Sequence, residues 1–191
     1  TNIFREVSGR GAFILQQDLE EFENNLVNYT GSKYAVGVAN ATDGLQIGLM
    51  AGGLKEGGEV IISSHTMIAT ASAIHFAGGV PVPVDCGKDL MIDLTSAAKE
   101  INDKTVAIMP TQLNGRTCNM DEIKEFANKY NLAIYEDAAQ ALGSKFKNKK
   151  AGTFGISSAI SLYPAKILGC LGDGGAILTN DKDVYEKIML L

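Results

Sequence analysis

Short apolar runs and amphipathic segments alternate along most of the 191-residue chain. Runs such as YAVGVA at 34–39 and TVAIMP at 105–110 have the length and apolar character of buried strands. The segments between them place apolar residues three or four positions apart, which is the spacing of a helix that buries one face. The pattern therefore predicts a three-layer α/β fold, in which helices flank a mostly parallel sheet.

Turn residues and prolines refine the individual elements. We expect an amphipathic helix over 15–31 that ends at a glycine, and a strand at 80–85 near a sheet edge, because its prolines limit pairing. Asn119 precedes the amphipathic segment 119–131 and is expected to cap it. The other expected strands are 34–39, 59–63, 105–110, 132–137, 156–162 and 174–180, and the other expected helices are 42–54, 66–78, 94–102 and 181–191.

Composition narrows the class of protein. The chain is 46% hydrophobic and 20% charged, as is typical of soluble globular proteins. Its net charge of −5 lacks the basic footprint of a nucleic-acid-binding protein, and no apolar run reaches the ~18 residues of a membrane span. Three widely separated cysteines favour reduced thiols in a cytoplasmic protein, and two histidines without a CxxC pair disfavour a zinc site.

Polar residues at strand ends are the candidates for chemistry, because ligands of α/β sheets bind beyond the carboxyl ends of the strands. Thr42 lies where a helix opens after strand 34–39, so it belongs either to an anion site or to a plain helix cap. Asp137 ends a buried strand, so it either pairs with a cationic ring nitrogen or caps a turn. Lys166 is either an amine that forms a Schiff base or an ordinary surface lysine.

Taken together, these residues match the requirements of pyridoxal 5'-phosphate. Its phosphate needs N–H groups and hydroxyls, its ring nitrogen a carboxylate, and its aldehyde an amine. Ser161, five positions before Lys166, offers a second hydroxyl for the phosphate. The segments YAVGVANATDGLQIGL, YEDAAQALGS and SLYPAKILGCLGDGGAILTND moreover resemble the DegT/DnrJ/EryC1/StrS aminotransferases over essentially the whole chain.

This resemblance implies the large domain of fold-type-I pyridoxal-phosphate enzymes. It also implies transfer of an amino group from an amino acid, with glutamate expected, to a nucleotide-linked keto-sugar. Lys166 is expected to form the Schiff base and to act as acid and base, Asp137 to face the pyridine nitrogen, and Gln140 to lie near the phenolic oxygen of the ring. The phosphate contacts implied by the resemblance are Ala41, Thr42 and Ser161.

Three positions depart from the family pattern. Met67 stands where an aromatic residue commonly stacks on the cofactor ring, so we expect a thioether contact there, with His65 as a weaker candidate. Gln112 and Asn114 replace a histidine and a tyrosine that are usual in a stretch near the active site. The identity of the sugar, its ring position and the nucleotide therefore stay open.

Length is a further departure, because family members continue into a second, smaller domain without a counterpart here. We expect residues 1–191 to be the cofactor-binding large domain, with an N-terminal helical arm at about 1–31. The resemblance also implies a homodimer with shared active sites. The 191-residue chain alone is accordingly expected to bind cofactor weakly, to self-associate and to lack transaminase activity.

Three alternatives compete with an aminotransferase. A sugar dehydratase of the same family would carry a histidine in place of Lys166. A nicotinamide-dependent reductase would use Tyr163 and Lys166, but the Tyr-x-x-x-Lys spacing is one residue short and no GxGxxG follows the first strand. A non-catalytic family member is disfavoured by the lysine and by Asp137, and favoured by the missing second domain.

Overall fold

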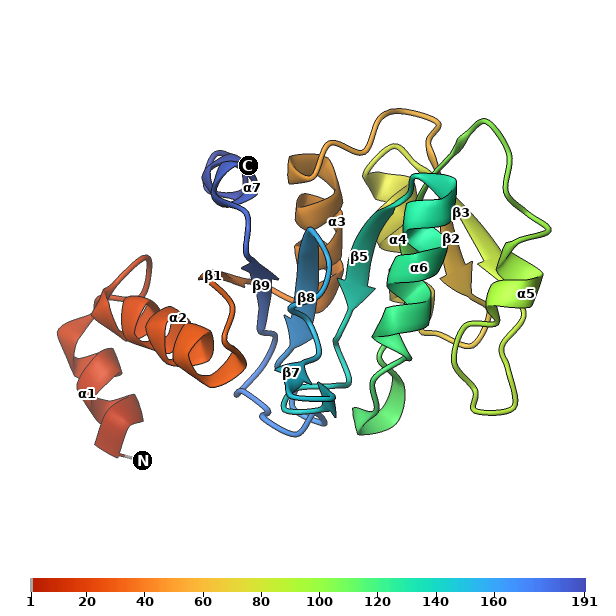
Figure 1. Cartoon of the computed structure of the whole chain (residues 1–191). Coiled ribbons are helices and arrows are strands. Elements are labelled where there is room, and N and C mark those ends of the chain that lie inside the picture. Colours follow the sequence, from red (N-terminus) through yellow and green to blue (C-terminus); the bar gives the residue numbers. More distant parts are fainter. Residues whose placement is uncertain (1) are drawn as a thin grey trace.

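A seven-stranded sheet forms the centre of the molecule (Figure 1), as seen in a computed structural model that describes residues 2–191. Its strands are β1 (Tyr34–Val38), β2 (Glu59–Ser63), β3 (Val80–Val84), β4 (Thr105–Met109), β5 (Ala133–Asp137), β8 (Ser157–Ser161) and β9 (Gly175–Thr179). They lie in the order β1-β9-β8-β5-β4-β2-β3. All neighbours from β8 to β3 are parallel, whereas β9 runs antiparallel to β8 and β1. The mostly parallel sheet and the edge position of β3 are both confirmed.

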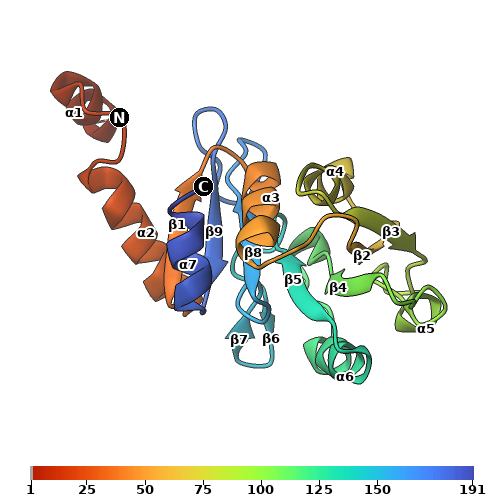
Figure 2. The ribbon, with the colours of Figure 1, turned by 90° about the horizontal axis from the view of Figure 1, so that it is seen from above.

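Helices connect these strands and cover both faces of the sheet, as Figure 2 shows from above. Most of the expected helices form within a few residues of their expected bounds, but α5 ends at Ala97 rather than near residue 102. Helices α1 and α2 lie within the N-terminal helical arm expected at about 1–31, whereas the small hairpin of β6 and β7 was not predicted. The helical elements are α1 (Asn2–Arg10), α2 (Gln17–Thr30), α3 (Ala41–Ala51), α4 (Ile68–Phe76), α5 (Leu94–Ala97), η1 (Leu113–Gly115), α6 (Met120–Tyr130) and α7 (Lys182–Ile188), and the hairpin is β6 (Lys145–Phe146) with β7 (Lys149–Lys150).

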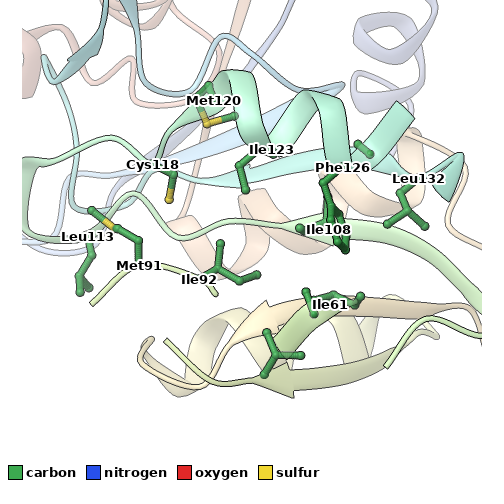
Figure 3. Packing of buried hydrophobic residues seen from close by; sticks show 13 residues of the cluster. Ile61, Met91, Ile92, Ile108, Leu113, Cys118, Met120, Ile123, Phe126 and Leu132 are labelled. Atoms are coloured by element: carbon green, nitrogen blue, oxygen red, sulfur yellow. The ribbon is translucent and has the colours of Figure 1, made fainter. Parts of the chain in front are cut away.

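Successive residues of an inner strand pack against helices on opposite faces of the sheet. Val60 and Ile62 of β2 pack in one cluster with Ile74 of α4. Ile61, which lies between them, belongs to the opposite cluster with Phe126 of α6 (Figure 3). Since successive side chains of a strand point to opposite faces, an apolar run such as EVIIS indicates a strand that is buried on both sides.

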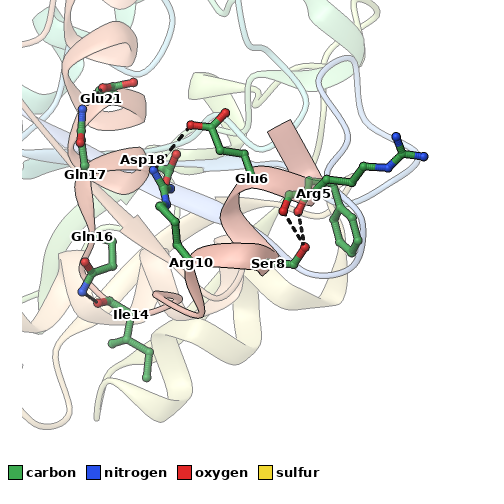
Figure 4. Close-up of polar contacts among 10 residues, drawn as sticks. Arg5, Glu6, Ser8, Arg10, Ile14, Gln16, Gln17, Asp18 and Glu21 are labelled. Carbon is green, nitrogen blue, oxygen red and sulfur yellow. Dashed lines mark hydrogen bonds and ion pairs between the residues drawn. The ribbon is translucent and has the colours of Figure 1, made fainter. Parts of the chain in front are cut away.

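The N-terminal helices lie at the β1 end of the sheet. Helix α2 buries Leu26 and ends at Gly31, whose φ of 78° is left-handed, so the expected helix with a glycine end is confirmed. None of the described residues of α1 is buried. An ion pair from Arg10 to Asp18 links the two helices (Figure 4).

The remaining structural expectations concern caps and spans. Asn119 caps α6, because its side chain accepts the N–H of Glu122. No helix within residues 2–191 has both the length and the apolar character needed to cross a bilayer. The three cysteines are free thiols in the same residue range.

Candidate active site

A cleft of about 640 Å³ lies at the carboxyl ends of the central strands. Its wall combines the first turn of α3, the start of α4, the end of β5, and the segment that follows β8. The structure brings into this one cleft all seven residues that were expected to contact the cofactor, apart from the weaker candidate His65. They are Ala41, Thr42, Met67, Asp137, Gln140, Ser161 and Lys166.

The first turn of α3 presents unpaired donors to the cleft. Asn40 caps the helix, since its Oδ1 accepts the N–H of Asp43 at 2.9 Å while its Nδ2 donates to Asp43 Oδ2 at 2.9 Å. Among the described residues, the N–H groups of Ala41 and Thr42 have no acceptor, and the Thr42 hydroxyl has no partner. The cap and the anion site are therefore compatible, because the cap satisfies one N–H and leaves two at the positive end of the helix.

Glycine at position 175 allows this first turn to pack against β9. A Cβ there would lie 2.6 Å from the carbonyl carbon of Asn40 and 2.9 Å from the nitrogen of Ala41. Both contacts are with backbone, which cannot swing aside as a flexible side chain can. The glycine therefore sets how closely β9 approaches the start of α3.

Asp137 is a buried carboxylate at the end of β5. Its Oδ2 accepts a 2.6 Å hydrogen bond from the Thr70 hydroxyl, and its Oδ1 accepts the N–H of Ala139 at 3.1 Å. Burial raises its pKa above the ordinary value, while the hydrogen bonds from Thr70 and Ala139 and the charge of Lys166 act in the opposite direction. The side chain thus caps a turn, as one interpretation of the sequence expected, and also lines the cleft.

Lys166 belongs to the segment between β8 and β9. Its own N–H donates to the carbonyl of Tyr163 at 2.8 Å, which closes a tight turn that contains Pro164. Within the described residues, its ammonium forms no hydrogen bond and no ion pair, although its charge acts on Asp137. The amine is half-buried and lines the cleft without a permanent partner, so it is free to meet a ligand.

Gln140 is held from the side of η1. Its Oε1 accepts the N–H of Asn114 at 3.2 Å and its backbone carbonyl accepts the N–H of Gly115 at 2.9 Å. A second hollow of about 380 Å³ adjoins the cleft and shares Gln140, Ser161 and Lys166 with it. Asn114 lines that second hollow, so this departure from the family pattern lies beside the site.

Gln112 has a different position from Asn114. It is fully buried, donates from Nε2 to Glu136 Oε2 at 2.8 Å and accepts the N–H of Cys118 at 2.7 Å. It lines neither the cleft nor the second hollow. Its replacement of the usual histidine therefore touches the packing behind β5 rather than the ligand space.

Met67 and His65 also differ in whether they line the cleft. Met67 is the N-cap residue of α4, remains 61% exposed, and lines the cleft. His65 is exposed but does not contribute to the lining. A thioether at the mouth of the cleft can pack on an aromatic ring, whereas the weaker candidate does not reach the site.

Acidic residues outnumber basic residues in the lining of the cleft. Asp43, Asp137 and Asp173 line it together with one basic residue, Lys166. The anion-binding capacity of this wall therefore rests mainly on the α3 N–H groups and on the hydroxyls of Thr42 and Ser161. The wall combines a phosphate-sized donor set, a buried carboxylate and an amine, which suits a phosphorylated cofactor with a basic ring nitrogen and an aldehyde.

A sequence profile of the DegT/DnrJ/EryC1/StrS aminotransferase family matches residues 1–191. The chain belongs to this family. It is 39% identical over 182 residues to the dTDP-3-amino-3,4,6-trideoxy-alpha-D-glucose transaminase of Streptomyces venezuelae, covering 95% of this chain and 48% of that protein. It is 38% identical over 185 residues to the UDP-2-acetamido-2-deoxy-3-oxo-D-glucuronate aminotransferase of Pseudomonas aeruginosa, covering 96% of this chain and 52% of that one.

A solved structure extends the family comparison to the fold. NtdA of Bacillus subtilis, with the cofactor PMP bound, superposes with a TM-score of 0.91 at 34% identity, covering 98% of this chain and 42% of that one. The expected fold-type-I architecture is therefore confirmed. The chain spans about half the length of the curated relatives that it matches.

Sequence reasoning missed two polar residues of this site. Asp173 lines the cleft, and the Thr70 hydroxyl donates to Asp137 from the first turn of α4. One signal for Thr70 was available, because it is a buried hydroxyl in the otherwise small and apolar helix IATASAIHF. Nothing in its spacing connects it with a carboxylate 67 positions later.

Proposed function

We propose that this protein is a pyridoxal-phosphate-dependent nucleotide-sugar aminotransferase, and that residues 1–191 form its cofactor-binding large domain. The observation that carries the proposal is one convergence in space. The free N–H groups at the start of α3, the Asp137 carboxylate and the Lys166 amine face the same cleft, although they come from distant parts of the sequence.

Each part of the cofactor has a matching set of residues. The N–H groups of Ala41 and Thr42, with the hydroxyls of Thr42 and Ser161, would hold the phosphate. Asp137 would accept a hydrogen bond from the protonated pyridine nitrogen, and Gln140 would lie near the phenolic oxygen of the ring. Met67 would pack against the ring from the start of α4.

Lys166 and Asp137 carry the chemistry. Pyridoxal phosphate, when bound, supplies an electron-withdrawing ring and an aldehyde that reacts with amines. Lys166 would supply the amine that combines with such an aldehyde, with release of water, and its Nζ would hold and move a proton as a general acid and base. Asp137 would hold the proton on the ring nitrogen, because the ion pair offsets the cost of its buried charge.

The substrates are inferred from the relatives. One is named for a dTDP-linked amino sugar and another for a UDP-linked 3-oxo sugar, so we infer a nucleotide-linked keto-sugar as acceptor. The donor that we propose is an amino acid, glutamate, as the family resemblance implies. The second hollow beside Gln140 and Lys166 offers space for a sugar next to the reactive amine. Because the relatives differ in nucleotide, the similarity alone does not select one.

A homodimer in the cytoplasm completes the proposal. Ile167, Leu168 and Leu171 follow Lys166 directly and are 77%, 52% and 95% exposed. An apolar surface of this kind beside a cleft is typical of an interface between subunits. The three free thiols support a reducing compartment.

The test is an amino-transfer assay on the intact protein loaded with pyridoxal phosphate. It should convert a dTDP-, UDP- or GDP-linked keto-sugar to the amino sugar with glutamate as donor. Lys166→Arg should abolish the transfer while keeping the charge, and Lys99→Arg, an exposed position outside the cleft, should leave it unchanged. Full transfer by Lys166→Arg would contradict the proposal, as would no transfer to any sugar of the panel.

A further inference from the structure

A row of three threonine hydroxyls leads to the buried carboxylate of Asp137. Thr70 Oγ1 donates to Asp137 Oδ2 at 2.6 Å, Thr66 Oγ1 lies 2.7 Å from Thr70 Oγ1, and Thr111 Oγ1 lies 2.9 Å from Thr66 Oγ1. We call these three residues the threonine chain. None of the three lines the cleft surface, and all three lie outside the residue set assigned to the cofactor.

The threonine chain joins three adjacent strands at their carboxyl ends. Thr66 follows β2, Thr111 follows β4, and Asp137 ends β5, while Thr70 lies in the first turn of α4. Thr70 is fully buried and Thr111 is 4% exposed. Thr66, between them in the network, is partly buried. Buried hydroxyls are costly unless they are hydrogen-bonded, so two of them joined through Thr66 form a built network rather than a chance contact.

The direction of the hydrogen bonds follows from counting hydrogens. A hydroxyl has one hydrogen to donate, and Thr70 gives its hydrogen to Asp137. Thr66 must therefore donate to Thr70, and Thr111 must donate to Thr66. All three O–H dipoles then point toward the carboxylate, which is the arrangement in which hydrogen bonds reinforce one another.

We propose that Thr66 and Thr111 are positioning residues that act through Thr70 to hold the Asp137 carboxylate, charged and in one orientation, toward the cleft. As a role in catalysis this rests on the proposed function, since it serves the pairing of Asp137 with a cofactor ring. The hydrogen-bond direction itself depends only on the protein.

The other charged groups around Asp137 are few. Lys166 acts on it from the segment after β8, and the neighbouring Glu136 is held on the opposite side of β5 by Gln112 and by the N–H groups of Gly152, Phe154 and Gly155. The threonine chain contains no titratable group. Its effect on Asp137 is therefore a matter of hydrogen bonds and can be separated from charge effects by substitution.

The test is the carboxyl titration of Asp137 by carbon NMR in the intact protein without added cofactor, with its signal assigned by loss in Asp137→Asn. Thr70→Val removes the direct bond and should lower the acid dissociation constant of Asp137 about tenfold, because hydrogen bonds to charged groups contribute this much. Thr66→Val removes only the second bond and should lower the constant about twofold, through lost reinforcement. Thr66→Ser, which keeps a hydroxyl, should titrate like the wild type.

Thr30→Val is the matched control, because Thr30 is also buried and hydrogen-bonded but lies in α2. A titration in Thr66→Val and Thr111→Val that equals the wild type and Thr30→Val would overturn the proposal. If Thr66→Val does not fold, Thr111→Val tests the chain from its far end. The titration is measured without cofactor, so it does not depend on the proposed function. Failure of the proposed function would instead appear as absent amino transfer, while Thr70→Val and Thr66→Val still shift the titration of Asp137 as expected.

Discussion

Two adjacent carboxylates of β5 have opposite surroundings. Glu136 is fully buried and accepts four hydrogen bonds, from Gln112 Nε2 and from three backbone N–H groups. Asp137 accepts only two, which leaves acceptor capacity toward the cleft. Glu136 is thus saturated by the protein, whereas Asp137 retains room for a ligand.

This contrast makes a stability prediction for Asp137→Asn. Burial raises the pKa of Asp137 in the folded state above its ordinary value of 3.8. The folded protein then holds more protons than the unfolded chain, so its stability falls as pH rises through the interval between the two values. Asp137→Asn has no carboxyl group to titrate and so does not lose stability in this way. Its side-chain amide can donate to the Thr70 hydroxyl, because the three hydroxyls of the threonine chain can turn so that each donates away from position 137. Cofactor-free Asp137→Asn should therefore be at least as stable as the wild type at pH 8, while amino transfer falls at least about tenfold.

Urea denaturation of the cofactor-free protein at pH 5 and pH 8 checks this, and Glu136→Gln is the comparison. In Glu136→Gln the side-chain NH2 group would face backbone N–H groups that are themselves donors. The free energy of unfolding of this variant should therefore fall by about 2–4 kcal/mol. Equal destabilisation by both substitutions would show that Asp137 is a structural carboxylate like its neighbour.

At the scale of elements, the site depends on how closely α3 approaches the sheet. Gly175→Ala would press a methyl group against the backbone of Asn40 and Ala41, and the first turn of α3 would have to shift. We expect a loss of about 1–3 kcal/mol in stability and weaker binding of pyridoxal phosphate, because its phosphate donors move. Equilibrium unfolding and cofactor titration measure the two effects. Gly9→Ala, with nothing within 4 Å of the added methyl, is the control, and equal cofactor affinity in both variants would count against the donor role of this turn.

The elements that the sequence could predict are those with a strong local period. The strand EVIIS and the amphipathic α6 with its Asn119 cap agree closely with expectation, because their patterns report burial directly. The bounds of α1 within the expected N-terminal arm could not be predicted, because this helix buries no residue and its ends therefore carry no burial pattern. The short β6–β7 hairpin carries mainly lysines and gives no alternation to detect.

The candidate site shows the same division. Lys166 and Asp137 stand in motifs that resemble a family, so their placement in one cleft could be anticipated. The threonine chain could not, because its bonds join positions 45 and 67 residues apart, and a hydroxyl carries no sign of its distant partner. Register between parallel strands, which only the folded sheet reveals, brings these residues together.

At the scale of the whole molecule, the exposed apolar side chains after Lys166 are the clearest sign of an assembly. Leu171→Asp would place a charge in the proposed dimer interface and should weaken the dimer about tenfold or more, as measured by sedimentation of the intact protein over a range of concentrations. Phe76→Asp, also at an exposed apolar position but at the end of α4 away from Met67, should leave the association unchanged. Unaltered association of Leu171→Asp would exclude this surface as the interface.

Covalent attachment of the cofactor to Lys166 is the central claim, and trapping it is the most direct measurement. The intact protein loaded with pyridoxal phosphate is reduced with borohydride, digested, and analysed by peptide mass spectrometry. We expect the pyridoxyl group on Lys166 in the peptide that contains YPAKILG, and its loss in Lys166→Arg. An adduct on another lysine, or one that persists in the variant, would contradict the assignment of this cleft as the active site.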